Sequence, residues 1–315
     1  MSAAAPYAAL KPDVVLDAIA AIGMQPDGRL LALNSYENRV YQAGLEDGTF
    51  VVAKFYRPHR WNDAAITEEH GFARELADAE LPMVAPLAFD GATLLRHEGF
   101  RYAIYPRRGG RAPPLESRDH LEWVGRLLAR MHNVGARQPF AHRGSIDPET
   151  FVIEPSQAVL HSALLPARLH DRYAQAAETV GQAIAARFDA VGPVIRLRLH
   201  GDCHPGNLLW TDAGPHFVDL DDARMGPAMQ DLWMLAADEA ALDALLEGYA
   251  QFRDFDPRER ALVPALRAMR QVHWAGWIAA RWHDPAFPAA FPFAVEPRWW
   301  EQHIDDLHEA ADALA

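Results

Sequence analysis

The chain has 315 residues, of which 50% are apolar and 23% charged, and this composition excludes a disordered or low-complexity protein. At about 100–200 residues per domain, the length predicts two domains or one large two-lobed domain. The net charge of −13 argues against nucleic acid or an anionic membrane as a partner.

The sequence also bears on the compartment. No apolar run is long enough to span a bilayer, and the first residues lack the charged and apolar blocks of a signal peptide. Cys203 is the single cysteine, so no internal disulfide can form, which fits a reducing compartment. We therefore expect a globular protein of the cytoplasm that makes no membrane contact.

Short β-branched and aromatic stretches in the first hundred residues predict strands. They lie at residues 30–33, 39–42, 50–56, 92–95 and 100–105. One helix is expected between them, with Asn62 or Asp63 as its N-cap and Pro82 beyond its end. This order predicts an antiparallel sheet with one inserted helix.

Glu69 is an anomaly of this helix because it falls within the apolar face. At about 100° per residue, the apolar stripe consists of Ile66, Phe72, Ala73 and Leu76. A buried carboxylate is costly unless a cation pairs with it. Lys54, on the apolar central strand, is the candidate partner; the alternative is a helix that is only loosely buried at this point.

The pattern becomes helical after Pro106. Gly109-Gly110 and Pro113-Pro114 mark a connector, which predicts an N-terminal lobe at residues 1–106 and a C-terminal lobe at residues 107–315. Helices are expected around residues 121–131, 166–188, 229–252, 257–282 and 297–314. The predicted fold class is thus α+β, with a sheet-containing N-terminal lobe and a mostly helical C-terminal lobe.

The chemistry-bearing residues concentrate between His200 and Asp231. An alternating stretch at 195–199 leads into a polar loop, and residues 208–218 read as a β-hairpin. Antiparallel pairing brings Asn207, just before the hairpin, beside Asp219, just after it. Their amide and carboxylate oxygens suit Mg²⁺ with room for phosphates. Asp202 lies on the same loop, where it can orient or deprotonate a hydroxyl.

These residues match a known pattern: Asp-x-x-x-x-Asn, a metal-binding Asp after a strand, and an upstream strand Lys and helix Glu are typical of protein kinases. The form His-Gly-Asp-x-His-Pro-x-Asn at 200–207 resembles the aminoglycoside phosphotransferase and choline kinase superfamily. The segments at 55–58, 68–70, 200–207, 217–223 and 284–288 resemble the bacterial stress response kinase A (YihE-like) family. The resemblance covers essentially the whole chain.

The resemblance implies a two-lobed protein-kinase-like fold with ATP between the lobes. Lys54 would contact the α- and β-phosphates and pair with Glu69. Asp202 would be the catalytic base or hydroxyl-orienting group, and Asn207 and Asp219 would hold Mg²⁺.

The resemblance further makes Tyr105-Pro106-Arg107 the hinge, whose backbone faces adenine. The segment 34–38 occupies the place of the glycine-rich loop but has no glycine. Phosphate contact there would use Ser35, the Asn side chains or backbone N–H groups. About ten residues separate Asp219 from the helix expected at Met229, too few for a long activation loop. We therefore expect a site that needs no loop phosphorylation.

Four other residues of this region have structural interpretations. We expect His200 to bind the loop backbone, His204 to shape the loop, Cys203 to pack in the core and Asp231 to anchor the loop from below. A redox role for Cys203 is the alternative. The aromatic stripe formed by Trp274, Trp277, Ile278 and Trp282 is interpreted as core packing, with a substrate wall as the alternative.

The sequence thus predicts an ATP- and Mg²⁺-dependent kinase that phosphorylates a hydroxyl and acts as a monomer. The resemblance points to Ser and Thr of proteins, and to stress responses. The same-class alternative is a small-molecule kinase acting on an aminoglycoside, choline or a sugar-like alcohol. Other classes remain open: a metal-dependent hydrolase built on His200, Asp202 and His204, or a pseudokinase that binds nucleotide without catalysis.

Overall fold

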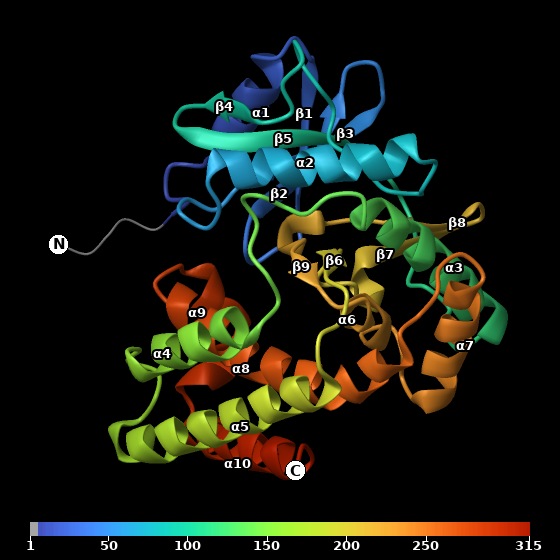
Figure 1. Ribbon diagram of the computed structural model, residues 1–315. Coiled ribbons are helices and arrows are strands. Elements are labelled where there is room, and N and C mark those ends of the chain that lie inside the picture. The colour runs from blue at the N-terminus through green and yellow to red at the C-terminus, as the bar shows by residue number, and fades with distance from the viewer. Residues whose placement is uncertain (1–5) are drawn as a thin grey trace.

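The computed structural model describes residues 6–315. A five-stranded antiparallel sheet forms the N-terminal part, and helices with two small two-stranded sheets form the rest (Figure 1). Within the described residues, no helix is long and apolar enough to cross a membrane. The α+β fold class is confirmed. The sheet's central strand pair ends at Pro106, where the lobe boundary is expected, and that boundary stays a prediction.

The sheet has the strand order β1-β2-β3-β5-β4. Its strands are β1 (Pro26–Leu33), β2 (Arg39–Leu45), β3 (Phe50–Phe55), β4 (Leu95–His97) and β5 (Phe100–Pro106). β3 lies in the middle, where Lys54 is paired with Val40 on one side and Ala103 on the other. This position places a cationic side chain in the most buried strand of the sheet.

Four of the five predicted strands are confirmed, and the fourth in sequence is displaced. The expectation for it is residues 92–95, but Asp90-Gly91 makes a tight turn closed by a Phe89–Ala92 bridge, and β4 starts at Leu95. Asp90 and Gly91 both have positive φ, so the chain reverses before it can pair with β5.

Between residue 6 and Pro106 the structure has two helices, where the sequence predicts one. α2 (Asp63–Asp78) begins as predicted, with the Asn62 side chain accepting the Ala65 N–H at 2.8 Å. α1 (Pro12–Ala20) is the helix that the sequence analysis misses. It has Pro12 in its first turn and buries Val15, Ala18 and Ile19 in the core of the sheet. Nine residues carry too little periodicity to be distinguished from a loop by sequence alone.

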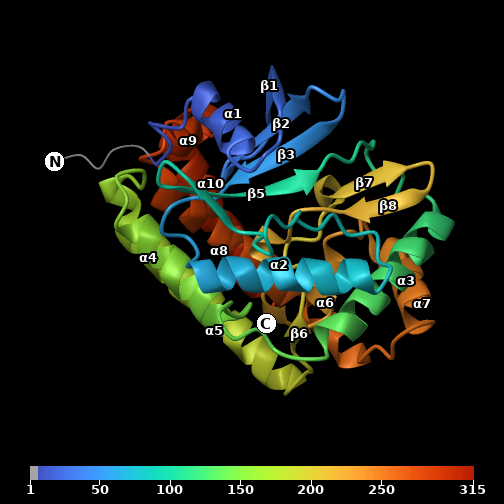
Figure 2. The ribbon, with the colours of Figure 1, turned by 90° about the horizontal axis from the view of Figure 1, so that it is seen from above.

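The helical part lies below the sheet-containing part in the view of Figure 1, and Figure 2 shows the same arrangement from above. Its helices are α3 (Arg118–Gly135), α4 (Glu154–Leu160), α5 (His170–Val191), α6 (Met229–Trp233), α7 (Glu239–Ala250), α8 (Val263–Arg281), α9 (Ala286–Ala290) and α10 (Pro297–Asp312). One continuous core of buried apolar side chains joins these helices, apart from α9, to α2.

The helix expected over 229–252 is two helices. α6 ends at Trp233, and Asp238 starts α7 by accepting the Ala241 N–H at 2.8 Å. A capping carboxylate at this point ends the continuity that the apolar pattern implied. The short helices α4 and α9 are also absent from the sequence-based expectation.

Two small antiparallel pairs carry the polar loop. β6 (Leu197–Arg198) pairs with β9 (Met225–Gly226), and the predicted hairpin is β7 (Leu208–Thr211) with β8 (Gly214–Phe217). Leu208 lies opposite Phe217, so the residues that flank the two strands meet at one end of the hairpin.

Candidate active site

The loop at 200–207 is anchored from below by one carboxylate. Asp231, at the start of α6, accepts the N–H groups of His200 at 2.8 Å and Gly201 at 2.9 Å, and its Oδ2 lies 3.1 Å from His132 Nε2. The His200 ring lies 2.9 Å from the carbonyl of Val218. The structural interpretations of His200 and Asp231 therefore agree with the geometry.

Gly201 allows the loop to pass close to the segment after Asp219. Its φ is 85°, in the left-handed region that favours glycine. A Cβ at this position would also overlap the backbone oxygen of Asp222. The sequence therefore requires glycine between His200 and Asp202.

Asp202 is held by two donors. Arg270 on α8 contacts its Oδ1 at 2.6 Å, and His204 Nε2 lies 3.5 Å from Oδ2. The Gly206 N–H donates to His204 Nδ1 at 2.9 Å, so the neutral ring carries its proton on Nε2 and faces Asp202 with a donor. Burial raises the pKa of Asp202, but the His204 hydrogen bond and the Arg270 charge together lower it below its ordinary value. The carboxylate stays ionised.

Asn207 and Asp219 lie at the same end of the hairpin, since the Val218 N–H donates to the Asn207 carbonyl at 3.1 Å. The Asn207 Nδ2 donates to the Asp202 carbonyl at 2.9 Å, which leaves Oδ1 without a partner in the described residues. Asp219 has a left-handed backbone (φ 64°), and its side chain is 49% exposed.

These two residues fit a divalent metal bound partly by the protein. The described residues contain no cluster of three His, Cys, Asp or Glu placed to hold a metal ion. Mg²⁺ is commonly bound through one or two protein oxygens together with substrate phosphates, because it keeps part of its water shell. The free Asn207 Oδ1 and the exposed Asp219 carboxylate match that donor set.

Lys54 faces Asp219 from the sheet. Its Nζ lies 2.7 Å from Asp219 Oδ1 and 3.3 Å from Asp221 Oδ1, and its side chain is 8% exposed. Burial lowers the pKa of the Lys54 ammonium, but the carboxylates of Asp219 and Asp221 raise it well above its usual value. The structure therefore brings together Lys54 and Asp219, which are 165 residues apart.

The predicted Lys54–Glu69 ion pair is wrong as a direct contact. Glu69 is buried as expected, at 2% exposure, but no cation of Lys or Arg lies within 4.0 Å of it in the described part of the chain. Lys54 instead forms ion pairs with Asp219 and Asp221. Burial raises the pKa of Glu69 to about 7, with the more distant Lys54 lowering it only in part.

Glu68 does not replace Glu69 as the partner of Lys54. Its carboxylate accepts the N–H groups of Ala141 at 2.5 Å and His142 at 2.8 Å, so it fixes the loop after α3.

The segment 34–38 joins β1 to β2, and its backbone carbonyl groups are bonded differently from its N–H groups. Arg57 donates to the carbonyls of Glu37 at 2.9 Å and Tyr36 at 3.1 Å, and Arg39 donates to the Tyr36 carbonyl at 3.2 Å. By contrast, the amide N–H groups of residues 35–37 and the Ser35 hydroxyl have no protein acceptor in the described residues. Unpaired donors of this kind suit phosphate oxygens.

Tyr105 and Arg107, two of the three residues predicted to form the hinge, have different surroundings. The Tyr105 hydroxyl lies 3.0 Å from the Tyr56 hydroxyl, and burial and the nearby Glu69 raise the pKa of Tyr105. Arg107 is exposed and donates to the Gln42 side chain at 3.2 Å. Their predicted contacts with adenine stay predictions.

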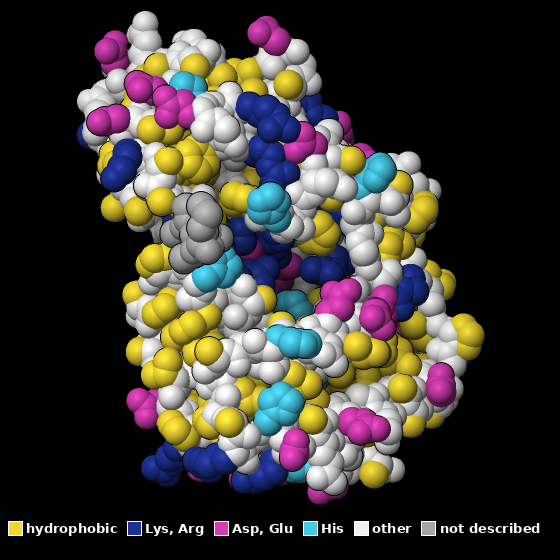
Figure 3. Space-filling view, turned by 90° about the vertical axis from the view of Figure 1, so that its left-hand side faces the viewer, with side chains coloured by type: hydrophobic (Ala, Val, Ile, Leu, Met, Phe, Trp, Pro, Cys, Tyr) yellow, Lys and Arg dark blue, Asp and Glu magenta, His cyan; other side chains and the backbone are white. Residues whose placement is uncertain are grey.

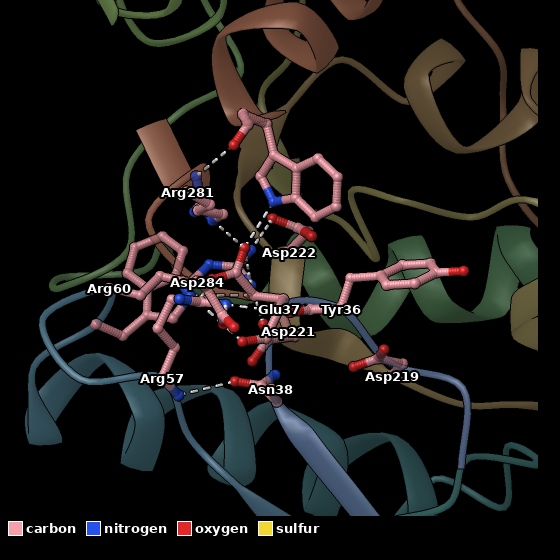
Figure 4. Close-up of polar contacts among 12 residues, drawn as sticks. Tyr36, Glu37, Asn38, Arg57, Arg60, Asp219, Asp221, Asp222, Arg281 and Asp284 are labelled. Atoms are coloured by element: carbon pink, nitrogen blue, oxygen red, sulfur yellow. Dashed lines mark hydrogen bonds and ion pairs between the residues drawn. The ribbon is translucent and has the colours of Figure 1, made fainter. Parts of the chain in front are cut away.

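Sequence reasoning missed several charged residues of the site. Asp221 is buried and is shared by Lys54 and Arg60, while Asp222 accepts from Arg60 at 2.5 Å. The signal was present in the run of acidic residues directly after Asp219, but spacing does not say which arginine reaches it. Figure 4 shows Asp221 and Asp222 beside Arg60 and Glu37, with Asp219 to one side of this group.

This cluster lies between the two parts of the molecule. Figure 3 shows the face on which the strand-rich part above and the helical part below are separated by a hollow, with Lys, Arg, Asp and Glu side chains gathered inside it. The arrangement combines the Lys54 ammonium, the side-chain oxygens of Asn207 and Asp219, N–H donors that are unpaired within residues 6–315, and the ionised Asp202 carboxylate. Such a set can bind a metal-bound polyphosphate and orient a hydroxyl toward it.

Comparisons with known proteins agree with this geometry. The model of the phosphotransferase enzyme family matches residues 29–263. Stress response kinase A of Escherichia coli (strain K12) is 44% identical over 98% of this chain and 94% of that protein. The serine/threonine protein kinase RdoA of Salmonella typhimurium (strain LT2) is 44% identical with the same coverage.

Solved structures of low sequence identity share the fold. The amicoumacin kinase hAmiN in complex with AMP-PNP and Ca²⁺ has a TM-score of 0.69 and 17% identity, covering 93% of both chains. The microcompartment-associated aminopropanol kinase has a TM-score of 0.67 and 19% identity, covering 94% of this chain and 98% of the other. The predicted protein-kinase-like fold is confirmed.

Proposed function

Because this chain belongs to the phosphotransferase enzyme family, with 44% identity to stress response kinase A, we propose that it transfers the γ-phosphoryl group of ATP to Ser or Thr hydroxyls of proteins. The observation that carries the proposal is the convergence of Lys54 with Asp219, beside a loop that holds Asp202 and Asn207. We also propose that the protein acts in a bacterial stress response, as the names of its relatives indicate.

Each residue has a role that its surroundings support. Lys54 neutralises phosphate charge, and the N–H groups of residues 35–37, with the Ser35 hydroxyl, bind phosphate oxygens. Asn207 and Asp219 hold Mg²⁺, which would neutralise charge on the phosphates and align them. Asp202 accepts a hydrogen bond from the acceptor hydroxyl and takes its proton as the bond to phosphorus forms.

The low pKa of Asp202 favours orientation over strong basicity. A carboxylate held by Arg270 and His204 is a weak base, so positioning and charge neutralisation supply most of the rate enhancement. A loose transition state requires little proton transfer before the phosphoryl group moves, which fits a weak base. Chemically, the hydroxyl oxygen bonds to the γ-phosphorus, the bond to the ADP oxygen breaks, and the proton leaves through Asp202.

A small-molecule acceptor is the second candidate. It is considered because the solved structures that share this fold include an amicoumacin kinase and an aminopropanol kinase, at 17% and 19% identity. The hydrolase alternative is disfavoured because the His200 and His204 rings are engaged in hydrogen bonds of the loop. The pseudokinase alternative is disfavoured because each catalytic position carries a reactive residue.

We further propose that the protein is a cytoplasmic monomer. The single cysteine supports this location, because it can form no internal disulfide. Cys203 is also fully buried, and burial raises the pKa of its thiol well above the usual value, which disfavours a redox role.

The test is transfer of labelled γ-phosphate from ATP in the presence of Mg²⁺. A basic protein, an acidic protein and a panel of amino alcohols and sugars would be offered in parallel, with Asp219→Ala as the negative control. We expect label on protein Ser or Thr and none with the variant. Label on small alcohols alone would contradict a protein acceptor and favour a small-molecule one. Full transfer by Asp219→Ala would contradict the assignment of Asp219 as a metal ligand.

A further inference from the structure

The side chain of Glu37 joins the segment 34–38, proposed above to bind phosphate, to the helical part of the molecule. Its Oε2 accepts the Trp277 Nε1–H at 2.6 Å and lies 2.6 Å from Arg281 Nε. Its Oε1 lies 2.8 Å from Arg57 Nε in the sheet-containing part. Trp277 and Arg281 stand one turn apart near the end of α8, about 240 residues along the chain from Glu37.

We infer that Glu37 is a positioning residue of this site: by bridging Arg57 and α8 it holds residues 34–38 in the conformation that presents their N–H groups to phosphate. The inference rests on the proposed function for the identity of the ligand. Glu37 itself touches no reacting atom, and it acts through the segment to which it belongs.

The contacts of the segment 34–38 engage its backbone carbonyl groups and leave its N–H groups available. The carbonyls of Tyr36 and Glu37 accept from arginines, whereas the N–H groups of residues 35–37 are unpaired in the described residues. Arginine side chains can saturate carbonyls but cannot accept from N–H groups. The Glu37 bridge therefore fixes the segment while leaving its donors available.

A second set of contacts supports the same placement. Asp284, just beyond α8, lies 2.7 Å from Arg57 Nη2 and 2.8 Å from Arg39 Nη2. The Tyr36 ring packs on Phe291 with a centroid distance of 5.1 Å. In Figure 4, Glu37 lies among Arg57, Arg60 and Arg281, and Tyr36 extends toward the side on which Asp219 lies.

The charge of Glu37 matters as well as its shape. Its side chain is 11% exposed and faces three guanidinium groups, with Arg60 Nη1 at 3.6 Å in addition to Arg57 and Arg281. Burial lowers the pKa of Arg281, and Glu37 opposes this. A neutral residue here would leave buried cations with fewer partners.

In this inference, the Glu37 bridge positions backbone N–H groups for phosphate, which is the role of a glycine-rich loop in other kinases. The segment 34–38 contains no glycine. Its conformation is set by side-chain contacts from Arg57 and Trp277. A segment whose conformation is restricted by such contacts loses less entropy on binding phosphate. Separation of the two parts at this edge would have to break the Trp277 and Arg281 contacts.

The experiment removes the anchor from the α8 side, so that Glu37 and the phosphate-facing segment keep their sequence. Trp277→Phe deletes the indole donor and retains an aromatic ring, and Arg281→Met deletes the cation. Trp274→Phe and Arg267→Met are matched controls on the same helix. The Trp274 Nε1 has no hydrogen-bond partner and Arg267 no ion pair within 4.0 Å in the described residues.

Four quantities would be measured on the full chain: KM and kcat for ATP, affinity for Mg²⁺-ATP by titration, and amide hydrogen exchange of residues 34–38. Urea unfolding of every variant verifies the fold. We expect Trp277→Phe and Arg281→Met to raise KM and weaken ATP binding by about 5- to 20-fold, with a smaller change in kcat. Exchange at 34–38 should accelerate, and the two controls should match the wild type.

The possible results are separable. Unchanged KM and unchanged exchange in both variants would overturn the inference, and so would faster exchange with unchanged ATP affinity, because the bridge would then be structural only. If the wild-type protein transfers no phosphate, the proposed function fails, while ATP titration and hydrogen exchange still test the bridge. If Arg281→Met does not fold, Trp277→Phe decides.

Discussion

Lys54 is identifiable from the sequence, but its partner is not. An apolar strand with one lysine predicts a buried cation that needs a carboxylate, and Glu69 on an apolar helix face is the visible candidate. In the structure Lys54 contacts Asp219 and Asp221 instead, 165 residues away in the case of Asp219. Three carboxylates compete for one ammonium, and only the packed fold decides among them.

Glu69 is consequently a buried carboxyl without a close cation, and this has a pH-dependent cost. Its folded pKa of about 7 lies above the ordinary value of 4.5, so the folded state retains a proton that the unfolded state has lost. Stability of the wild type should therefore fall as pH rises through that range. Glu69→Gln has no such proton, so its stability relative to the wild type should rise by about 2 kcal/mol between pH 5 and pH 8.

Urea melts of the two proteins at several pH values test this. The Glu259 carboxyl, whose pKa burial also raises to about 7, is present in both proteins and cancels from the difference. A difference in the free energy of unfolding that does not vary with pH would show that Glu69 is ionised in the folded state.

Arg270 should control the ionisation of Asp202. Burial raises the pKa of Asp202, and His204 and Arg270 lower it. Arg270→Met removes one of the two lowering contacts, so the acid limb of the pH profile of kcat/KM should move to higher pH, with lower activity on the acid side. Arg267→Met, one turn earlier on α8, is the control. An acid limb that stays in place would mean that the ionisation of Asp202, as altered by Arg270, does not set the acid limb.

At the scale of elements, predictions succeed where local signals are strong. The β7–β8 hairpin, the cap at Asn62 and the central strand β3 all follow from turn residues, capping chemistry and β-branched runs. The helices α1, α4 and α9 are missed because each has nine residues or fewer, and the break between α6 and α7 is hidden by an apolar pattern that continues across it.

The loop at 200–207 depends on the backbone conformation of Gly201. Gly201→Ala places a Cβ against the Asp222 carbonyl at a φ of 85°. We expect a loss of about 2 kcal/mol or more in the free energy of unfolding, together with a large loss of activity. Gly144→Ala is the control, since a Cβ added there would meet no atom within 4 Å. Equal stability of the two variants in urea melts would contradict the strained conformation.

At the scale of the whole molecule, the fold and the residues proposed for the site can be predicted from the sequence because a combined motif spans most of the chain. The ionic bridges between the two parts of the molecule cannot be predicted in this way. Trp277 and Glu37 are 240 residues apart, and Arg57 and Asp284 are 227 apart. Charged residues at such separations show no periodicity that would pair them. Composition is equally silent, since a net charge of −13 does not reveal that Lys54, Arg60 and Arg270 gather around the site.

The central claim is that Asp202 addresses the acceptor hydroxyl, while Lys54, Asn207 and Asp219 address the metal-bound nucleotide. Its most direct test compares Asp202→Asn with the wild type in two assays, labelled γ-phosphate transfer and Mg²⁺-ATP titration. We expect transfer to fall by at least about 100-fold while the ATP dissociation constant stays within about twofold. Unchanged transfer, or a defect confined to ATP binding, would contradict the claim.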